Sequence, residues 1–579
     1  MAKKASGKNQ KKQQAAIRIV VMAAILICVN VLASYFHSGI DLTKEKRFTL
    51  SPSTERLLKN MKEVAVIDVY LKGKFPAGLQ RLQEAVRERL RSFKDVAGNK
   101  IIFRFIDPFD GKSEAERKQI AHELDQKGVR AIELKTENDD EYSMKVFFPY
   151  ALVQYNGREL PLYLLEKKSS GNTAEEISYA ETQLEYKFAN ALNQMGKPDI
   201  TRIAYVTGNG EPLGINTFDM LKTVAYHYYL DTIDLSRITK ISLAYDAIII
   251  AQPTLPFTGP EKLRIDQYVM RGGHVLWSLN MLKASLDSFA NSPQFISMDY
   301  GLDIDDLLFK YGVRVNNDLV EDKLNLPLPR TMNDGPPQLH DWIYFPKLNP
   351  TSDNPIVRNM DFIRAGFTNS IDTIRTPEIK KTVLLQTSKY SLKSAAPVRV
   401  SLSMMNYQVK DEMFNKSYLP VAVLLEGKFK SAYQNRLAPE YLHILDSLEQ
   451  PFKPVCDSDN SMIVTSVGDL FINRYTAKDG ILPMGYYWYS KEYFANHDFL
   501  LNCLEYLTDR SGVLEARSKD VKLRLLDGGR VHEEKTKWQI VNIAIPIAAV
   551  LIFASAYFFF RKRRYEVKHN SINSLSHNA

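Results

Sequence analysis

The decapeptide IAYVTGNGEP, residues 203–212, decides the fold that the surrounding sequence builds. Its first four residues are apolar and favour a strand, and the glycine-rich turn Gly208–Glu211 follows them almost directly. Apolar residues at helical spacing then predict a helix over Thr217–Tyr228. A strand, a glycine turn and a helix in this order are typical of one unit of a parallel α/β sheet.

The segments on both sides repeat the pattern. Nearly continuous apolar strands that alternate with helices indicate a parallel, doubly wound sheet. Further strands are predicted at Leu230–Asp234, Ala247–Ala251, Val275–Ser278, Thr382–Ser388, Val421–Leu425 and Ser461–Ser466, and helices at Gly259–Arg271 and Asp498–Tyr506. Between them, Tyr311–Asp322 suggests a strand and turn, and Leu324–Gln338 is predicted to be a proline-rich connection.

Ligands of such sheets bind at the carboxyl ends of the strands. Candidate ligand or partner residues are therefore those of the two turns that follow strands, namely Gly208, Asn209, Gly210, Glu211, Gly468 and Asp469. The first turn matches neither G-x-G-x-x-G nor the Walker lysine motif, and Pro212 removes an amide donor. A purely structural turn is the alternative, and we expect no ATPase activity from this chain.

A smaller α/β domain is predicted before this sheet. Thr54–Met61 reads as a helix capped by Ser51 or Ser53, with Pro52 in its first positions. Strands, helices and a hairpin then follow in a thioredoxin-like outline without a Cys-x-x-Cys motif, so redox chemistry is not expected. These elements are Val64–Leu71, Leu79–Phe93, Ile101–Ile106, Ser113–Gln126 with a Ser113–Glu116 capping box, Val129–Leu134, and the hairpin Lys145–Gln154 with Glu159–Leu165.

The ends of the chain are apolar runs with basic flanks. Ile19–Phe36 follows six Lys and Arg residues, and Trp538–Phe560 precedes Arg561–Arg564. Each run is long enough to cross the roughly 30 Å hydrocarbon core of a bilayer as a helix. The positive flanks place both termini in the cytoplasm and export the block between them. A cleaved signal peptide is the alternative for the first run.

Charge and cysteine content exclude several classes of protein. Of the net charge of +9, residues 1–36 carry +6 and residues 538–579 carry +4, which leaves −1 on the residues between. The basic character therefore reflects membrane orientation, and nucleic-acid binding is not expected. Cys28 lies in the first apolar run, and Cys456 and Cys503 either pair or are buried thiols. No spacing indicates a metal site, a cofactor or a catalytic motif, so the chain is predicted not to be an enzyme.

These features divide the chain into eight segments. The predicted boundaries are a basic cytoplasmic tail (1–18), a transmembrane helix (19–36), the small α/β exported domain (37–166), a linker with an amphipathic helix (167–197), the large doubly wound domain with insertions (198–510), a juxtamembrane segment (511–537), a second transmembrane helix (538–560) and a basic tail (561–579).

In this order, the sequence resembles the auxiliary, substrate-binding subunits of gliding-motility-associated ABC transporters of Bacteroidetes, the GldG family. The segments that carry the resemblance are DLTKEKRFTLSPST (41–54), VAVIDVYL (64–71), FIDPF (105–109), ETQLEYKFANAL (181–192), YVTGNGEP (205–212), YGVRVNNDLVED (311–322), LPVAVLLEGKFKSAY (419–433) and MIVTSVGDLFIN (462–473).

The resemblance implies an inner-membrane protein that works with a separate ATPase and a separate permease. It also implies that the large domain is related to glutamine-amidotransferase-like sheets. Related turns often read TGHGE, whereas Asn209 replaces the histidine here, which argues against a metal or enzymatic role. Arg47, Phe48 and Pro546 are the candidate contacts to the permease or membrane. The lipid bilayer is an expected partner. The exported domains would bind a substrate, an envelope protein, a cell-wall component or another copy of the chain. An envelope hydrolase or amidotransferase-like enzyme and a structural cell-wall tether are the rival functions.

Overall fold

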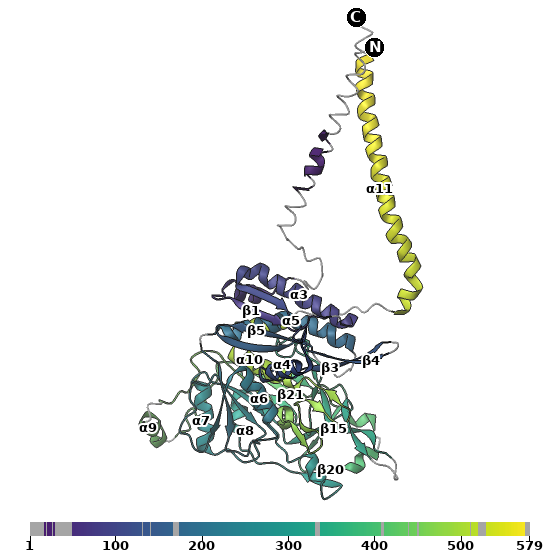
Figure 1. Ribbon diagram of the computed structural model, residues 1–579. Helices are drawn as coiled ribbons and strands as arrows, with labels where there is room; N and C mark the ends of the chain where they lie inside the picture. The colour runs from purple at the N-terminus through teal and green to yellow at the C-terminus, as the bar shows by residue number, and fades with distance from the viewer. Residues whose placement is uncertain are drawn as a thin grey trace. The chain divides into compact units, whose positions relative to one another are not determined.

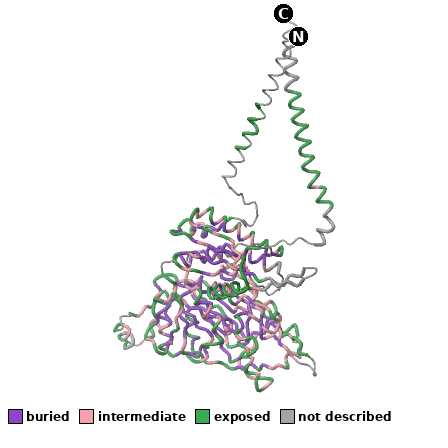
Figure 2. Tube along the Cα trace, viewed as in Figure 1, coloured by how far each residue is buried: buried purple, intermediate pink, exposed green. Residues whose placement is uncertain are grey.

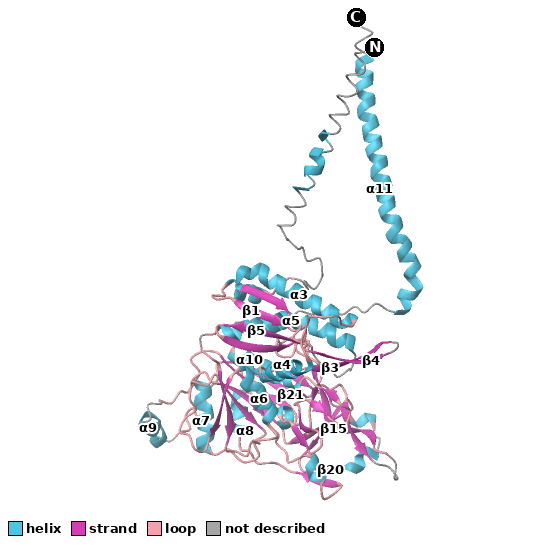
Figure 3. Cartoon of the chain, viewed as in Figure 1, coloured by secondary structure: helices cyan, strands magenta, loops and turns pink. Residues whose placement is uncertain are grey.

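The structure is a computed structural model. It describes residues 17–18, 20–25, 27–28, 49–73, 75–129, 131–138, 141–165, 173–197, 199–330, 336–406, 410–437, 439–447, 451–509, 511–518 and 528–573. The chain forms two units, Met1–Asp520 and Val521–Ala579. Mixed helices and strands in the first unit confirm the predicted α/β class (Figures 1 and 3).

A four-stranded sheet in the order β2-β1-β5-β6 organises the N-terminal part of the first unit. Its first two strands are parallel and its last three are antiparallel. The elements of this part are α2 (Pro52–Lys59), β1 (Ala65–Val69), α3 (Ala77–Ala97), β2 (Ile101–Phe105), α4 (Glu114–Gln126), β3 (Ile132–Asn138), β4 (Glu141–Phe147), β5 (Tyr150–Tyr155), β6 (Arg158–Tyr163) and α5 (Thr173–Gly196).

Two predicted helix starts are confirmed by their hydrogen bonds. The Ser51 side chain accepts from the Thr54 amide, and Pro52 occupies the first helical turn of α2. At α4, Ser113 and Glu116 form the reciprocal capping box. The long amphipathic α5 packs on the same core as α3, where Phe188 lies 6.3 Å from Phe93 between ring centroids.

The predicted strand Lys145–Gln154 is wrong as a single element. The chain leaves β4 after Phe147, and β5 starts only at Tyr150. Pro149 lies between them, and a proline cannot donate to a strand ladder. As a result, β4 pairs with β3 in a separate hairpin, whereas β5 pairs with β1 and β6.

A ten-stranded sheet organises the C-terminal part of the first unit, in the order β14-β15-β18-β21-β22-β10-β9-β7-β8, with β16 paired to β15. The five strands from β22 to β8 are parallel, and β21 joins them antiparallel. The parallel strands are β7 (Arg202–Thr207), β8 (Tyr229–Asp234), β9 (Ala247–Ala251), β10 (His274–Ser278) and β22 (Asn460–Thr465). The antiparallel strands are β14 (Asn325–Arg330), β15 (Gln338–Pro350), β16 (Ile363–Arg364), β18 (Ile379–Gln386) and β21 (Pro420–Gly427).

Helices cover both faces of the parallel strands, as in a doubly wound sheet (Figure 1). Along β7, Ile203 and Tyr205 face one apolar core, and Ala204 and Val206 face the other. The first core includes α6 (Phe218–His227) and α10 (Asn496–Thr508), and the second includes α7 (Gly259–Met270) and α8 (Asp305–Tyr311). All five residues of β9 are buried, as the apolar run predicts. Buried residues of the first unit lie mainly in its interior, with exposed residues around them (Figure 2).

The predicted proline-rich connection Leu324–Gln338 is partly wrong, because Asn325–Arg330 forms β14. Leu326 and Leu328 alternate with Pro327 and Pro329, and only the leucines are buried. The strand lies at the edge of the sheet, where missing amide donors are tolerated. The remaining described elements are β11 (Gln294–Ser297), β12 (Val313–Val315), β13 (Asp318–Asp322), β17 (Ile371–Thr373), β19 (Ser391–Ala395), β20 (Val398–Ser401), α9 (Pro439–Ser447), β23 (Arg474–Thr476), β24 (Gly480–Leu482), β25 (Tyr486–Tyr487) and β26 (Glu492–Tyr493).

The second unit is built around α11 (Gly528–Asn573). Its segment Thr536–Arg563 is the one helix among the described residues that is long and apolar enough to cross a membrane. Pro546 lies inside it. The first predicted membrane helix is represented only by helical residues 20–25 and 27–28, and its other residues lie outside those that the structure describes.

Candidate functional site

The turn Gly208–Glu211 lies at the carboxyl end of β7, next to the point where the strand order reverses between β7 and β9. Gly208 and Gly210 have φ angles of 118° and 79°, which favour glycine. A Cβ on Gly208 would lie 2.7 Å from Asp234 Oδ1, and one on Gly210 would lie 2.1 Å from Thr254 Oγ1. Both glycines are therefore required by the backbone and by close neighbours.

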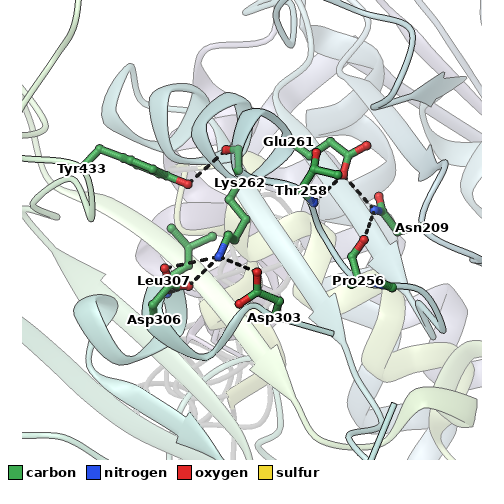
Figure 4. Close-up of polar contacts among 10 residues, drawn as sticks. Asn209, Pro256, Thr258, Glu261, Lys262, Asp303, Asp306, Leu307 and Tyr433 are labelled. Atoms are coloured by element: carbon green, nitrogen blue, oxygen red, sulfur yellow. Dashed lines mark hydrogen bonds and ion pairs between the residues drawn. The ribbon is translucent and has the colours of Figure 1, made fainter. Parts of the chain in front are cut away.

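Asn209 ties this turn to the loop after β9 and to the start of α7 (Figure 4). Its side-chain amide donates to Pro256 O (3.3 Å) and to Glu261 Oε2 (3.1 Å). The backbone carbonyl oxygen of Asn209 accepts from the amides of Thr254 and Leu255, each at 2.9 Å. With 2 % of its surface exposed, Asn209 is part of the structural frame of this edge.

Two carboxyl groups flank Asn209. Its backbone amide donates to Glu211 Oε2 (2.8 Å), while Glu261 caps α7 by accepting from the Thr258 amide (2.8 Å). Burial raises the pKa of Glu211 to about 7, and the nearby Glu261 and Asp234 carboxylates add to the rise, although backbone hydrogen bonds oppose it. Near neutral pH this buried group exchanges a proton, which is the property of a general acid or base.

The raised pKa of Glu211 predicts a pH-dependent stability. Between its ordinary pKa of 4.5 and about 7, the unfolded chain loses this proton and the folded chain keeps it, so stability falls as the pH rises through that window. We expect Glu211→Gln to leave stability at pH 4.5 nearly unchanged and to raise the free energy of unfolding at pH 8 by about 2 to 3 kcal/mol. Urea unfolding of the full chain in detergent at both pH values measures this.

Glu114→Gln is the matched control, because the Glu114 side chain is 86 % exposed. It should shift stability little at either pH. A loss of stability in Glu211→Gln at pH 8 would show instead that the ionised carboxylate stabilises the fold.

Gly468 and Asp469 lie at the end of β22 and are separated from the first turn by β9 and β10 in the strand order. The Gly468 amide donates to Asn280 Oδ1 (2.8 Å). Asp469 forms an ion pair with the buried Arg364 (3.3 Å) and accepts from the Gly366 amide (3.2 Å). The two predicted turns therefore do not form one cluster.

The segment Gly366–Ser370 crosses the carboxyl ends of β10 and β22. Thr368 Oγ1 donates to Ser466 O (2.9 Å), and the Met281 amide donates to Asn369 Oδ1 (2.8 Å). The Ser370 amide and hydroxyl both donate to Asp318, which is 4 % exposed. The chain itself thus covers the carboxyl ends of these two strands, whereas the switch point lies between β7 and β9.

The predicted membrane-proximal contacts have different positions. Pro546 lies inside the apolar part of α11. Arg47 and Phe48 lie outside the described residues.

A cavity of about 530 Å³ lies between the N-terminal and C-terminal parts of the first unit. One wall is formed by β6 and α5, and the other by α6, the segment 483–495 and α10. Volumes of this size, placed between domains, are common for binding sites. Seven tyrosines line it, at positions 150, 163, 179, 186, 226, 228 and 493.

The two walls are joined by a buried polar contact. Glu505 of α10 is 3 % exposed and accepts from Tyr186 Oη and from Asn190 Nδ2 (2.7 Å) of α5. Burial, together with His497, lowers the pKa of His227 on α6 to about 4, so its imidazole is neutral at pH 7. The sequence analysis missed this cavity because its walls come from segments that are far apart in the chain.

The C-terminal part of the first unit matches a known protein family. Residues 201–503, more than half of the chain, match the family described as "ABC-type uncharacterized transport system". The chain belongs to this ABC transport auxiliary family. Residues 44–154 match a second family, described as a domain of unknown function.

Three proteins that are similar to this ABC transport auxiliary chain share little sequence identity with it. A protein of Borreliella burgdorferi is 21 % identical over 569 residues, which cover 96 % of this chain and 99 % of that protein. The N-terminal domain of mmIFT52 (14 % identity, 53 % of this chain and 97 % of that one, TM-score 0.30) and a ThuA-like protein from Parabacteroides merdae (12 %, 57 % and 94 %, TM-score 0.23) are similar solved structures. Likenesses at these TM-scores do not establish a shared fold.

Proposed function

We propose that the chain is a non-catalytic, membrane-anchored auxiliary subunit of an ABC-type transporter that works with separate ATPase and permease subunits. The family match over residues 201–503 carries this proposal. The apolar segment Thr536–Arg563 supports a membrane anchor. A role in gliding motility, as in the resembling subunits, is the finer form of the proposal, as is the relation of the large domain to amidotransferase-like sheets.

The proposed topology has both termini in the cytoplasm and the main domains in the periplasm of a bacterial inner membrane. The basic run Arg561–Arg564 directly after the apolar segment supports a cytoplasmic C-terminus. The second unit would then contact lipid and permease, with Pro546 at that surface, and Arg47 and Phe48 would do so beside the first helix. The exported block would bind a substrate, an envelope protein, a cell-wall component or a second copy.

The polar groups of the predicted turns support a non-catalytic role. Asn209 holds a loop and a helix cap, and Asp469 is paired with Arg364. These side chains perform structural tasks that any catalytic use would disturb.

Glu211 favours one rival function, an envelope hydrolase or amidotransferase-like enzyme. Its pKa of about 7 suits general acid or base chemistry at a sheet edge. Under the proposed function, Glu211→Gln supports transport-linked activity at the wild-type level, measured by complementation of a deletion strain. Loss of complementation by a folded Glu211→Gln protein would favour the enzyme.

A further inference from the structure

The cavity between α5 and α10 is lined by a surplus of negative charge. Two lysines and two histidines share the lining with four carboxyl groups, Asp219, Asp361, Asp498 and Glu505. Because burial keeps the pKa of His227 at about 4, its imidazole does not offset the carboxylates at neutral pH. The lining side chains therefore favour a positively charged ligand over an anionic one.

The tyrosine rings of the cavity already attract cations. The Lys187 ammonium lies 5.9 Å from the Tyr163 ring centroid, and the Lys222 ammonium lies 5.8 Å from that of Tyr226. Rings that accept ammonium groups of the chain itself can accept those of a ligand.

The edge strand β6 decides how a peptide could bind. Tyr163 of β6 lies opposite Tyr150 of β5. The carbonyl of Tyr150 accepts from the Tyr70 amide, so the backbone groups of Tyr150 point toward β1 and away from β6. In an antiparallel ladder the backbone groups of Tyr163 then point away from β5, toward the outer edge of the sheet. The Lys187 ammonium donates a hydrogen bond to Tyr163 O (2.5 Å), and Pro161 has no backbone N–H to donate to an added strand. An edge blocked by a lysine and a proline does not accept an added strand, so recognition must use side chains.

We propose that this cavity binds a lysine- or arginine-bearing peptide segment of a partner protein. The cationic side chain would sit among the tyrosine rings and be neutralised by the carboxylates, with Asp498 and Tyr226 as contacts. The inference deepens the proposed function by naming the chemistry that the exported block recognises.

Calorimetric titration of the full chain in an uncharged detergent tests the proposal with three probes. These are a tri-lysine peptide with blocked ends, a tri-glutamate peptide with blocked ends, and chitotriose as a neutral sugar. Only tri-lysine is expected to bind, and its affinity should fall several-fold between about 50 mM and about 300 mM salt, because salt screens the attraction. Binding of chitotriose without tri-lysine, or no binding to the folded chain, would overturn the proposal.

Two variants locate the binding. Asp498→Asn and Tyr226→Ala are each expected to weaken tri-lysine binding about 5- to 10-fold. Asp411→Asn and Tyr390→Ala are matched controls, because Asp411 is 89 % exposed and Tyr390 is 51 % exposed and neither lines the cavity. They should bind tri-lysine as the wild type does. Equal affinity in the cavity variants, with circular dichroism that shows an intact fold, would contradict the assignment.

The test separates this inference from the proposed function. If tri-lysine binds but no ATPase or permease accompanies the chain from native membranes, the cavity assignment stands and the transporter role falls. The reverse outcome removes the ligand class and leaves the transporter role intact.

Discussion

Replacing Asp266 with alanine is expected to lower the free energy of unfolding by about 3 to 5 kcal/mol. Asp266 is completely buried on α7. It accepts four hydrogen bonds, from Tyr311 Oη (2.9 Å), Ser431 Oγ (2.6 Å), the Ala432 amide (2.9 Å) and Gln267 Nε2 (3.1 Å). Alanine would remove the acceptor of the Tyr311, Ser431 and Ala432 donors, whereas Gln267 Nε2 keeps its bond to Lys453 O. The 431–432 segment and α8 would thereby lose their polar contacts to α7.

Urea unfolding followed by tryptophan fluorescence measures this loss, because Trp277 is buried in the same apolar core as Tyr311. Asp266→Asn is the informative companion: its oxygen can still accept from Tyr311 and Ala432, so it should cost about half as much. Asp411→Ala, at an exposed position, should change stability by less than about 1 kcal/mol. An Asp266→Ala chain as stable as the wild type would contradict this prediction. It would show that the free-energy cost of burying the carboxylate equals the stabilisation from its hydrogen bonds.

Replacing Val550 with aspartate is expected to prevent α11 from crossing the membrane. Val550 lies near the middle of Thr536–Arg563, where a carboxylate costs about 3 kcal/mol or more to place in lipid. Ile540→Asp, near the end of the same segment, should be tolerated because its side chain reaches the interface.

The position of the C-terminal tail reports the result. A cysteine introduced as Ser576→Cys, with Cys28→Ser, can be probed by a membrane-impermeant maleimide on intact spheroplasts. Cys456 and Cys503 remain inert because they are buried, and burial raises the pKa of Cys456 to about 11. The tail should be labelled only in Val550→Asp. Labelling in the chain that carries Ser576→Cys and Cys28→Ser without Val550→Asp would place the C-terminus outside the cytoplasm.

Local sequence signals predicted the elements whose causes are local. Ser113 and Glu116 are three residues apart and define their own cap, and the apolar run Ala247–Ala251 needs burial on both faces. Pro149 and the pair Pro327 and Pro329 were harder to interpret. A proline can end a strand or lie at a sheet edge, and only the tertiary arrangement decides which.

The candidate site could be predicted in part. The sequence located the Gly208–Glu211 turn at a strand end, but it could not show that the Asn209 side chain donates a hydrogen bond to Glu261, which lies 52 residues later. The filling of the edge by Gly366–Ser370 and the cavity beside Glu505 depend on contacts between distant segments. Such contacts leave no periodic pattern in a single sequence.

The membership of this chain in a transport complex is tested most directly by its purification from native membranes in a mild detergent. The account predicts that an ABC ATPase and a permease are recovered with the full chain in fixed proportions, and that ATP hydrolysis accompanies the complex. Recovery of the chain without either subunit, under conditions that keep other ABC complexes intact, would contradict it.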